Sequence, residues 1–321
     1  MSLKINGLSK RFSDKWVLRD VGFEAEPGRI FGIFGASGAG KTTLLRLLGG
    51  DLKSDGGTIQ LDDTQLNESS PSNWATFFHK PSSRGFLASL FRKTDIKSNE
   101  GFAVDFESTL RSSHPILLLD DPFCCIDSRL RQESVETLRS VAAERGLIVL
   151  FTSNRFDEML RTCDEVAVLC SGEVIQTGSP QEIYETPVTC EIAALTGWNN
   201  MLEARRLSSS KAETQEFQTI VGGHRIVAQR ADLATLGALN QNVWLSIRPE
   251  QVPISFGAAF PEDNLLKAVV TKIKQLGPTT LISLDASGLP VNAAVFRLVG
   301  LKIGDECMIG LPIDRISILS K

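Results

Sequence analysis

One eight-residue segment constrains the fold more than any other: GASGAGKT, from Gly35 to Thr42. It matches the pattern G-x-x-x-x-G-K-[ST] in full, with the apolar run RIFGIFG before it and the helical pattern KTTLLRLL after it. A glycine-rich turn in this position directs successive backbone N–H groups at phosphate oxygens, and the helix N-terminus adds partial positive charge. The segment therefore predicts nucleotide binding, with Lys41 at the β- and γ-phosphates and the Thr42 hydroxyl on Mg²⁺.

The rhythm of the chain predicts two domains. From Leu3 to about Gly172, short apolar runs alternate with helical patterns, as in an α/β domain with a mostly parallel sheet. PILLLDD and GLIVLFTS indicate strands buried on both faces, EVAVLCSGEV indicates a further strand, and SRLRQESVETLRSVAAERG indicates a helix that Gly146 terminates. From about Asn200 the sequence pattern changes to short β-like segments separated by turn residues. We predict a P-loop domain over residues 1–199 and a small all-β domain over 200–321.

Composition excludes several classes of protein. The chain carries 34 basic and 38 acidic residues, a net charge of -4, and so lacks the basic footprint of a nucleic-acid binder. Neither a signal-peptide core in MSLKINGLSKRF nor an apolar run of about 18 residues is present, which predicts a cytoplasmic protein unless a partner holds it at a membrane. The six cysteines form no CxxC pair, so neither a zinc site nor a disulfide framework is predicted.

Several segments together resemble the ATP-binding subunits of ABC transporters, of the importer type with a C-terminal TOBE-like domain. The resemblance is carried by LSKRFSDKWVLRDVGFEAEPGRIFGIFGASGAGKTTLLRLLGG, SDGGTIQLDD, ILLLDDPFCCID, SGEVIQTGSPQEIYETP and LSIRPEQV, in the family's order. It implies an α/β ABC-type P-loop domain followed by a small TOBE/OB-like all-β domain. It also implies ATP and Mg²⁺ as cofactors, and ATP hydrolysis coupled to solute transport.

The resemblance also assigns site residues. Nucleotide contacts are expected from Phe12, Gly35, Ser37, Gly38, Ala39, Gly40, Lys41, Thr42 and Thr43. Phe12 takes the place of the aromatic residue that stacks on adenine, although an ordinary strand-edge role remains open because Trp16 lies close enough to compete. Metal ligands are expected from Thr42, Asp120 and His79, which aligns with the family's Q-loop glutamine. Because hard Mg²⁺ prefers oxygen, a structural role for His79 is the favoured alternative.

Two catalytic positions depart from the family pattern. Asp121 stands where the family has the glutamate that polarises the attacking water, and a carboxylate misplaced by about 1 Å can cost about 100-fold in rate. Ser153 stands where the family has the switch histidine, and serine is shorter and cannot become cationic. Asn154 or Arg155 are possible substitutes for the missing donor. The sequence thus predicts weakened hydrolysis.

The interval between the two phosphate-site motifs departs further. Asp120 follows Lys41 by 79 positions, fewer than usual in the family, and no LSGGQ-like signature lies between them. The nearest candidate is IKSNEG, before the stripe Phe102, Phe106, Leu110, which predicts an amphipathic helix. A shortened helical lobe is implied. Cys124 and Cys125 fall in the family's D-loop, where we expect small residues at a tight interface rather than a redox sensor.

Two functions remain open from the sequence. In the first, the chain is the ATP-binding and ATP-hydrolysing subunit of an ABC solute importer, peripheral on the cytoplasmic side of the plasma membrane. Its expected partners are transmembrane permease subunits and a second ABC ATPase subunit, in a homodimer or a heterodimer. In the alternative, it is a largely non-hydrolytic regulatory or assembly subunit paired with an intact ABC ATPase. A small-molecule P-loop kinase would need an acceptor pocket, and the β domain argues against it.

Overall fold

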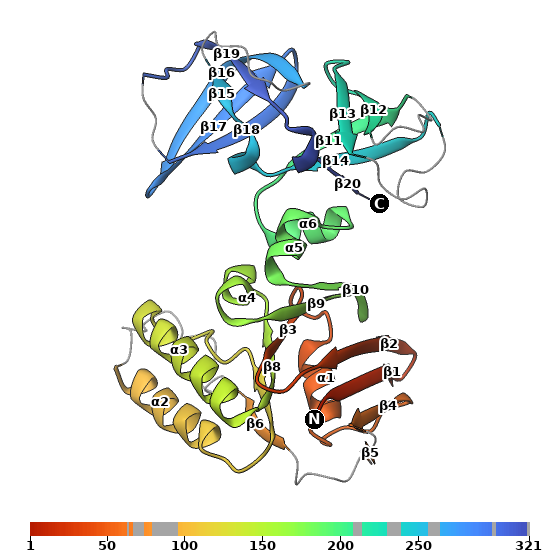
Figure 1. Ribbon diagram of the computed structural model, residues 1–321, viewed down its shortest axis with the longest axis vertical. Coiled ribbons are helices and arrows are strands. Elements are labelled where there is room, and N and C mark those ends of the chain that lie inside the picture. The colour runs from red at the N-terminus through yellow and green to blue at the C-terminus, as the bar shows by residue number, and fades with distance from the viewer. Residues whose placement is uncertain are drawn as a thin grey trace. The chain divides into compact units, whose positions relative to one another are not determined.

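A computed structural model describes residues 1–62, 64–66, 74–78, 96–207, 214–229, 239–255, 264–296 and 300–319 of the protein. The chain forms two compact units, Met1–Gln181 and Glu182–Lys321, drawn in Figure 1. The sequence placed the boundary at 199/200, in the change of composition, whereas the first compact unit ends 18 residues earlier. Among the described residues, no helix is long and apolar enough to cross a membrane.

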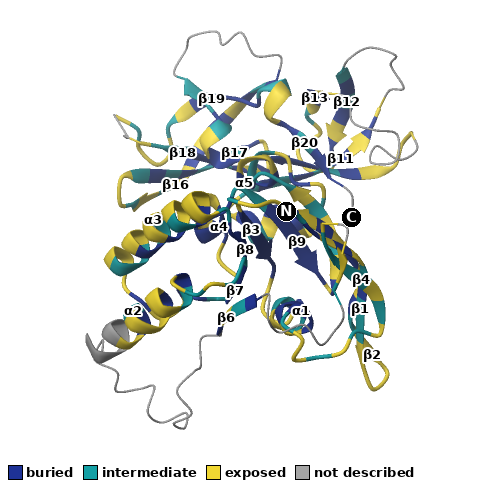
Figure 2. Ribbon diagram, turned by 60° about the horizontal axis from the view of Figure 1, so that its bottom comes forward, coloured by how far each residue is buried: buried dark blue, intermediate teal, exposed yellow. Residues whose placement is uncertain are grey.

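The first unit contains a six-stranded sheet whose strand order is β10-β9-β3-β8-β7-β6. All neighbours pair in parallel except β9 and β10. The strands are β3 (Ile30–Phe34), β6 (Trp74–Phe78), β7 (Ile116–Asp120), β8 (Ile148–Ser153), β9 (Glu165–Cys170) and β10 (Glu173–Gly178). Every residue of β3 and β8 is buried, and Figure 2 shows these strands in the colour of burial. The predicted mostly parallel sheet with buried middle strands is confirmed.

One predicted strand is two. The segment EVAVLCSGEV turns back on itself between β9 and β10, where Ser171 and Gly172 have φ values of 49° and 87°. Two successive residues with positive φ reverse the chain in a tight hairpin. The prediction of a single strand was wrong because apolar composition hid the Ser-Gly turn signal.

A second, antiparallel sheet of order β2-β1-β4-β5 completes the first unit. Its strands are β1 (Leu3–Phe12), β2 (Lys15–Ala25), β4 (Gly56–Leu61) and β5 (Thr64–Gln65). Leu3, Ile5 and Leu8 of β1 pack with leucines of helix α1 (Lys41–Leu48) and with the central strands in one hydrophobic core. This core holds the start of α1, and therefore the phosphate loop, against the central sheet.

Three more helices follow in this unit: α2 (Ile96–Leu110), α3 (Ser128–Arg145) and α4 (Phe156–Thr162). The predicted stripe of α2 is confirmed, since Phe102, Phe106 and Leu110 are all less than 10% exposed. IKSNEG does not precede this helix, because the helix begins at Ile96 and the segment forms its first turns. Gly146 terminates α3 as predicted, with φ 62° and its N–H donating to the Ala142 carbonyl.

The second unit is all-β apart from short helices. Its two five-stranded sheets have the orders β13-β12-β11-β14-β20 and β15-β19-β16-β17-β18. The strands are β11 (Asn200–Arg206), β12 (Thr214–Thr219), β13 (Arg225–Gln229), β14 (Asn242–Ile247), β15 (Ile254–Ser255), β16 (Leu265–Leu276), β17 (Thr279–Ala286), β18 (Leu289–Val295), β19 (Glu306–Gly310) and β20 (Ser317–Leu319). Alternate residues of strands such as β17 enter a common core, as the period of two in the sequence predicts.

Buried Arg248 explains why the helices before β11 belong to this unit. Its guanidinium lies over the Tyr184 ring at 3.9 Å and donates to the Tyr184 carbonyl at 2.6 Å and to Thr196 Oγ1 at 2.7 Å. Tyr184 lies in α5 (Pro180–Glu185) and Thr196 in α6 (Cys190–Thr196). One side chain that follows β14 therefore anchors both short helices.

Candidate active site

The phosphate loop connects β3 to α1, and its backbone depends on glycine. A Cβ at Gly35 would lie 2.3 Å from the Leu169 carbonyl oxygen, and Gly40 has φ 111°. A hypothetical Cβ at Gly38 would meet no atom within 4 Å, so the rim of the loop is open. Ser37 is exposed there, whereas Ala39 is buried and anchors the loop in the core. The predicted loop has the form that lets backbone N–H groups face an anion.

Lys41 lies across this loop. Its Nζ donates to the carbonyl oxygens of Gly35 at 2.7 Å and Ala36 at 3.0 Å. Burial lowers the pKa of Lys41 below its ordinary value, and the negative charges of Asp121 and Asp120 oppose that shift. The ammonium group is thus close enough to both carboxylates to interact with them, which joins two predicted parts of the site.

The two aspartates are held by a residue that the sequence analysis did not assign, Thr152 of β8. Its hydroxyl donates to Asp120 Oδ1 at 2.7 Å and accepts from the Asp121 N–H at 3.0 Å. Asp120 ends β7, Asp121 follows it with φ 46°, and Asp120 pairs with Thr152 in the parallel register. The available signal was the alignment of the two strand ends, because hydroxyl and carboxylate then meet at one edge of the sheet.

The donor set suits magnesium. Thr42 is exposed at the start of α1, Thr43 is half-buried behind it, and Asp120 supplies a carboxylate at the neighbouring strand end. In the part of the chain that the structure describes, no group of three or more His, Cys, Asp or Glu residues could by itself hold a metal ion. Mg²⁺ in nucleotide sites is held by one or two protein oxygens together with phosphates and waters, so this sparse set fits.

Ser153 lies at the end of β8 but is fully buried. Its hydroxyl donates to Glu158 Oε2 at 2.7 Å and accepts from the Arg155 N–H at 3.1 Å. Burial raises the pKa of Glu158, and the hydrogen bond from Ser153 and the charges of Arg131 and Arg155 oppose that shift. The Ser153 hydroxyl is therefore committed to a neighbouring carboxylate.

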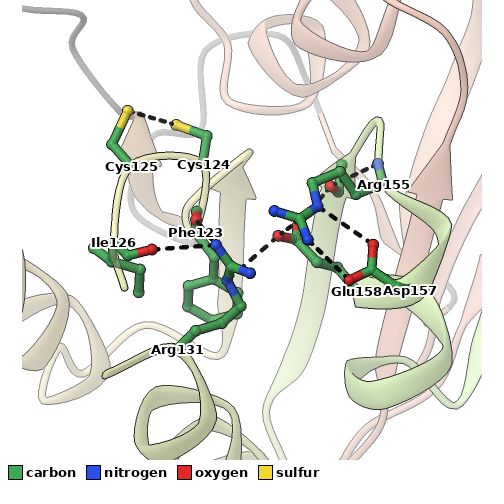
Figure 3. A network of polar contacts seen from close by, with 9 residues as sticks. Phe123, Cys124, Cys125, Ile126, Arg131, Arg155, Asp157 and Glu158 are labelled. Atoms are coloured by element: carbon green, nitrogen blue, oxygen red, sulfur yellow. Dashed lines mark hydrogen bonds and ion pairs between the residues drawn. The ribbon is translucent and has the colours of Figure 1, made fainter. Parts of the chain in front are cut away.

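Figure 3 shows the network around Glu158. Glu158 Oε1 lies 3.5 Å from Arg131 Nε and 3.6 Å from Arg155 Nε, and Arg155 also pairs with Asp157 at 2.9 Å. Arg131 comes from α3, while Arg155 and Asp157 flank the start of α4. The start of α4 is thereby tied to α3.

The residue after Ser153 is directed differently. Asn154 is exposed, and its Nδ2 lies 3.4 Å from Ser37 Oγ in the phosphate loop. The structure therefore brings the Asn154 amide, and not the Ser153 hydroxyl, to the rim of the loop.

The predicted adenine contact lies on the β1–β2 hairpin. Phe12 is 45% exposed and Trp16 is 40% exposed, and each ring has a basic side chain over it, Lys10 for Phe12 and Arg11 for Trp16. Both aromatic rings are thus accessible, and the choice between them stays open. His79 lies outside the described residues, so its predicted metal role stays a prediction.

Comparisons with known proteins match both parts of the chain to family models. The family model described as ABC transporter matches residues 18–99, and the model described as TOBE domain matches residues 245–319. The spermidine/putrescine import ATP-binding protein PotA of Fusobacterium nucleatum is 28% identical over 290 residues, covering 79% of this chain and 76% of its own. The chain is similar to ABC-type ATP-binding proteins that carry a C-terminal TOBE domain.

Two further proteins are similar to this chain. The Fe(3+) ions import ATP-binding protein FbpC 2 of Rhodococcus jostii is 27% identical over 326 residues, covering 88% of this chain and 87% of its own. A crystal structure of the ADP conformation of an ATP-binding cassette of an ABC transporter is 17% identical, with a TM-score of 0.49, and covers 61% of this chain and 98% of that chain.

Proposed function

We propose that the protein is the ATP-binding subunit of an ABC importer, that it binds Mg-ATP, and that it hydrolyses ATP slowly. The observation that carries the proposal is that the phosphate loop with Lys41 and the two aspartates follow the carboxyl ends of β3 and β7, parallel strands that both pair with β8, and that Thr152 is bonded to both aspartates. A phosphate loop, a cation and two carboxylates in one place are what phosphoryl transfer requires from a protein.

The proposed roles follow from the positions of the side chains. Lys41 and the loop N–H groups bind the phosphates, and Thr42 and Asp120 hold Mg²⁺, which when bound neutralises charge on the phosphoryl oxygens. Asp121 accepts the proton of the attacking water. Because Ser153 donates to buried Glu158, Asn154 is the better candidate for the donor that faces the terminal phosphate. Slow turnover is expected, since an amide carries no charge.

The names of the relatives indicate the chemical class of the transported solute but not the solute itself. Spermidine, putrescine and Fe³⁺, which the relatives' names give as imported solutes, are all cations. We therefore propose a cationic solute, transmembrane permease subunits as partners, and a second ATP-binding subunit in a homodimer or heterodimer. The permease would hold the chain on the cytoplasmic side of the plasma membrane.

A second candidate function rests on Ser153. Serine has no ring to replace the switch histidine, and its hydroxyl is buried and donates to Glu158, so it does not face the phosphate loop. This favours a subunit that binds ATP, closes an interface and leaves hydrolysis to an intact partner. The missing signature sequence, which stays a prediction from the resemblance, points the same way.

One experiment separates the two. Mg-dependent phosphate release and ATP binding are measured on the wild-type chain, on Lys41→Ala and on Asp120→Asn. Turnover by the wild type that both changes reduce by 100-fold or more supports the hydrolysing subunit. Binding without turnover in the wild type supports the regulatory subunit. Phosphate release that neither change reduces would refute the assignment of this site.

A further inference from the structure

The loop between β7 and α3 carries two adjacent exposed thiols. Cys124 Sγ donates to Cys125 Sγ across 3.5 Å, and both cysteines are exposed. Figure 3 shows the contact between the two sulfurs. The other four cysteines are buried or half-buried, and all six lie in the described part of the chain. In the single chain, the pair is therefore the most accessible thiol site, and the nucleotide chemistry proposed above does not use it.

The fold holds the pair in place from both sides. Phe123 is fully buried and Ile126 is 7% exposed, so the residues that flank the thiols are anchored in the core. Arg131 Nη2 donates to the carbonyl oxygens of both Phe123 and Ile126 at 3.2 Å. Arg131 therefore fixes the backbone on both sides of the two cysteines. The short distance between the sulfurs is thus a property of an anchored loop.

Geometry disfavours a disulfide between these two sulfurs. Adjacent Cα atoms are about 3.8 Å apart across a trans peptide, below the roughly 4.4–6.8 Å that relaxed disulfides span. A single atom that bridges two sulfurs requires a wider separation. With sulfur–metal bonds of about 2.3 Å and a tetrahedral angle, two sulfurs lie about 3.8 Å apart. The observed 3.5 Å is close to that value.

We propose that Cys124 and Cys125 form a dithiol site for trivalent arsenicals, the class of thiophilic centre that takes two sulfurs and keeps its third bond to its own substituent. Sulfur ligands select soft centres, and a site with two thiols and no third ligand among the described residues matches this valence. With an arsine oxide, two sulfur–arsenic bonds form, and the oxygen leaves as water with both thiol protons. Arsenic stays trivalent, so no oxidant or reductant is needed.

The electrostatics favour a reagent that uses both sulfurs. Burial and the hydrogen bond to Cys125 raise the pKa of Cys124 to about 12, so this thiol is neutral at pH 7. Reagents that attack one thiolate are slow at such a thiol. A reagent that binds one sulfur first meets the second as an intramolecular partner, which raises affinity by about 10² to 10⁴ over a single thiol.

The test uses phenylarsine oxide on the full-length chain. Intact-mass spectrometry and a count of free thiols should show one arsenical bound and two thiols lost per chain, reversed by a dithiol but not by an equal concentration of a monothiol. Cys124→Ser and Cys125→Ser should each weaken binding by at least about 100-fold. Cys190→Ser, a change at a half-buried single thiol, is the matched control and should bind like the wild type.

Two outcomes would overturn the proposal. Binding of equal strength by the wild type and by either single-serine variant of the pair would show that the second sulfur contributes nothing. Loss of binding in Cys190→Ser alone would move the site elsewhere. Because the readout is mass and thiol count, neither outcome depends on whether the chain hydrolyses ATP.

Discussion

Replacing Thr152 by valine tests whether this residue orients the metal-binding carboxylate. Valine keeps the branched shape of a fully buried side chain but removes the hydroxyl that donates to Asp120 Oδ1 at 2.7 Å and accepts from the Asp121 N–H. A hydrogen bond to a charged group contributes about 1.5–3 kcal/mol. The Asp121 N–H keeps a second acceptor, the Thr152 carbonyl at 3.1 Å, so its loss adds little. We expect the free energy of unfolding to fall by about 2 kcal/mol.

The functional effect should exceed the effect on folding. A side chain that orients a metal ligand typically accounts for about 10- to 100-fold in metal affinity. Thr152→Val should therefore need 10- to 100-fold more Mg²⁺ for half-maximal ATP binding, while metal-free nucleotide binding changes little. Magnesium titrations of ATP binding and urea unfolding curves measure the two effects separately.

Thr162→Val is the matched control for Thr152→Val. Thr162 is a fully buried threonine of the same unit, and its hydroxyl has no hydrogen-bond partner among the described residues. The same substitution there should leave Mg²⁺ dependence unchanged and should be neutral or stabilising, because burying an unsatisfied hydroxyl is unfavourable. Equal Mg²⁺ dependence of Thr152→Val and the wild type would refute the orienting role of Thr152.

Two further predictions concern buried charges. Burial raises the pKa of Glu158 above its ordinary value of 4.5, so the folded state binds more protons than the unfolded state. The contribution of Glu158 to stability is therefore largest below pH 4.5 and is lost as pH rises through the folded-state pKa. Glu158→Gln should flatten this part of the stability–pH profile in urea unfolding, and an unchanged slope would contradict the assignment. Arg248→Met should destabilise the second unit by about 3 kcal/mol or more, because Tyr184 and Thr196 lose their donor; a melting curve like that of the wild type would count against the anchoring role.

The strands and helices that periodicity defines were predictable from the sequence. β3, β7 and β8 are apolar on both faces, and α3 has both a periodic pattern and a terminating glycine, so local chemistry and fold agree. The β9–β10 hairpin was missed because two residues decide it, Ser171 and Gly172 with positive φ, inside an apolar run. IKSNEG was not assigned to α2 because it lacks the apolar spacing that marks the rest of the helix.

The site, like the fold, contains residues that the sequence could assign and residues that only the structure reveals. Lys41 and Asp120 could be assigned because motifs specify them in order along the chain. Thr152 was not assigned, since the two predicted strand ends bring it beside Asp120 only once the register between β7 and β8 is known. The sequence also does not reveal in which direction a side chain at the end of a strand points. Only the structure shows Asn154 at the phosphate loop and Ser153 turned toward Glu158.

The two departures at the catalytic positions belong to one structural unit. Thr152 holds the Asp121 N–H, and the next residue, Ser153, holds Glu158. Glu158 pairs with Arg131, which holds the backbone of the loop that follows Asp121. These contacts therefore connect Asp121, the proposed base, to Ser153 at the switch position, and connect Ser153 through Glu158 and Arg131 back to the loop after Asp121. A histidine ring at position 153 would have to displace the Glu158 side chain from its fully buried position. Arg131 would then lose its ion pair with the Glu158 carboxylate. Serine at this position and the anchored loop are thus physically dependent on one another, and neither can be judged as an isolated substitution.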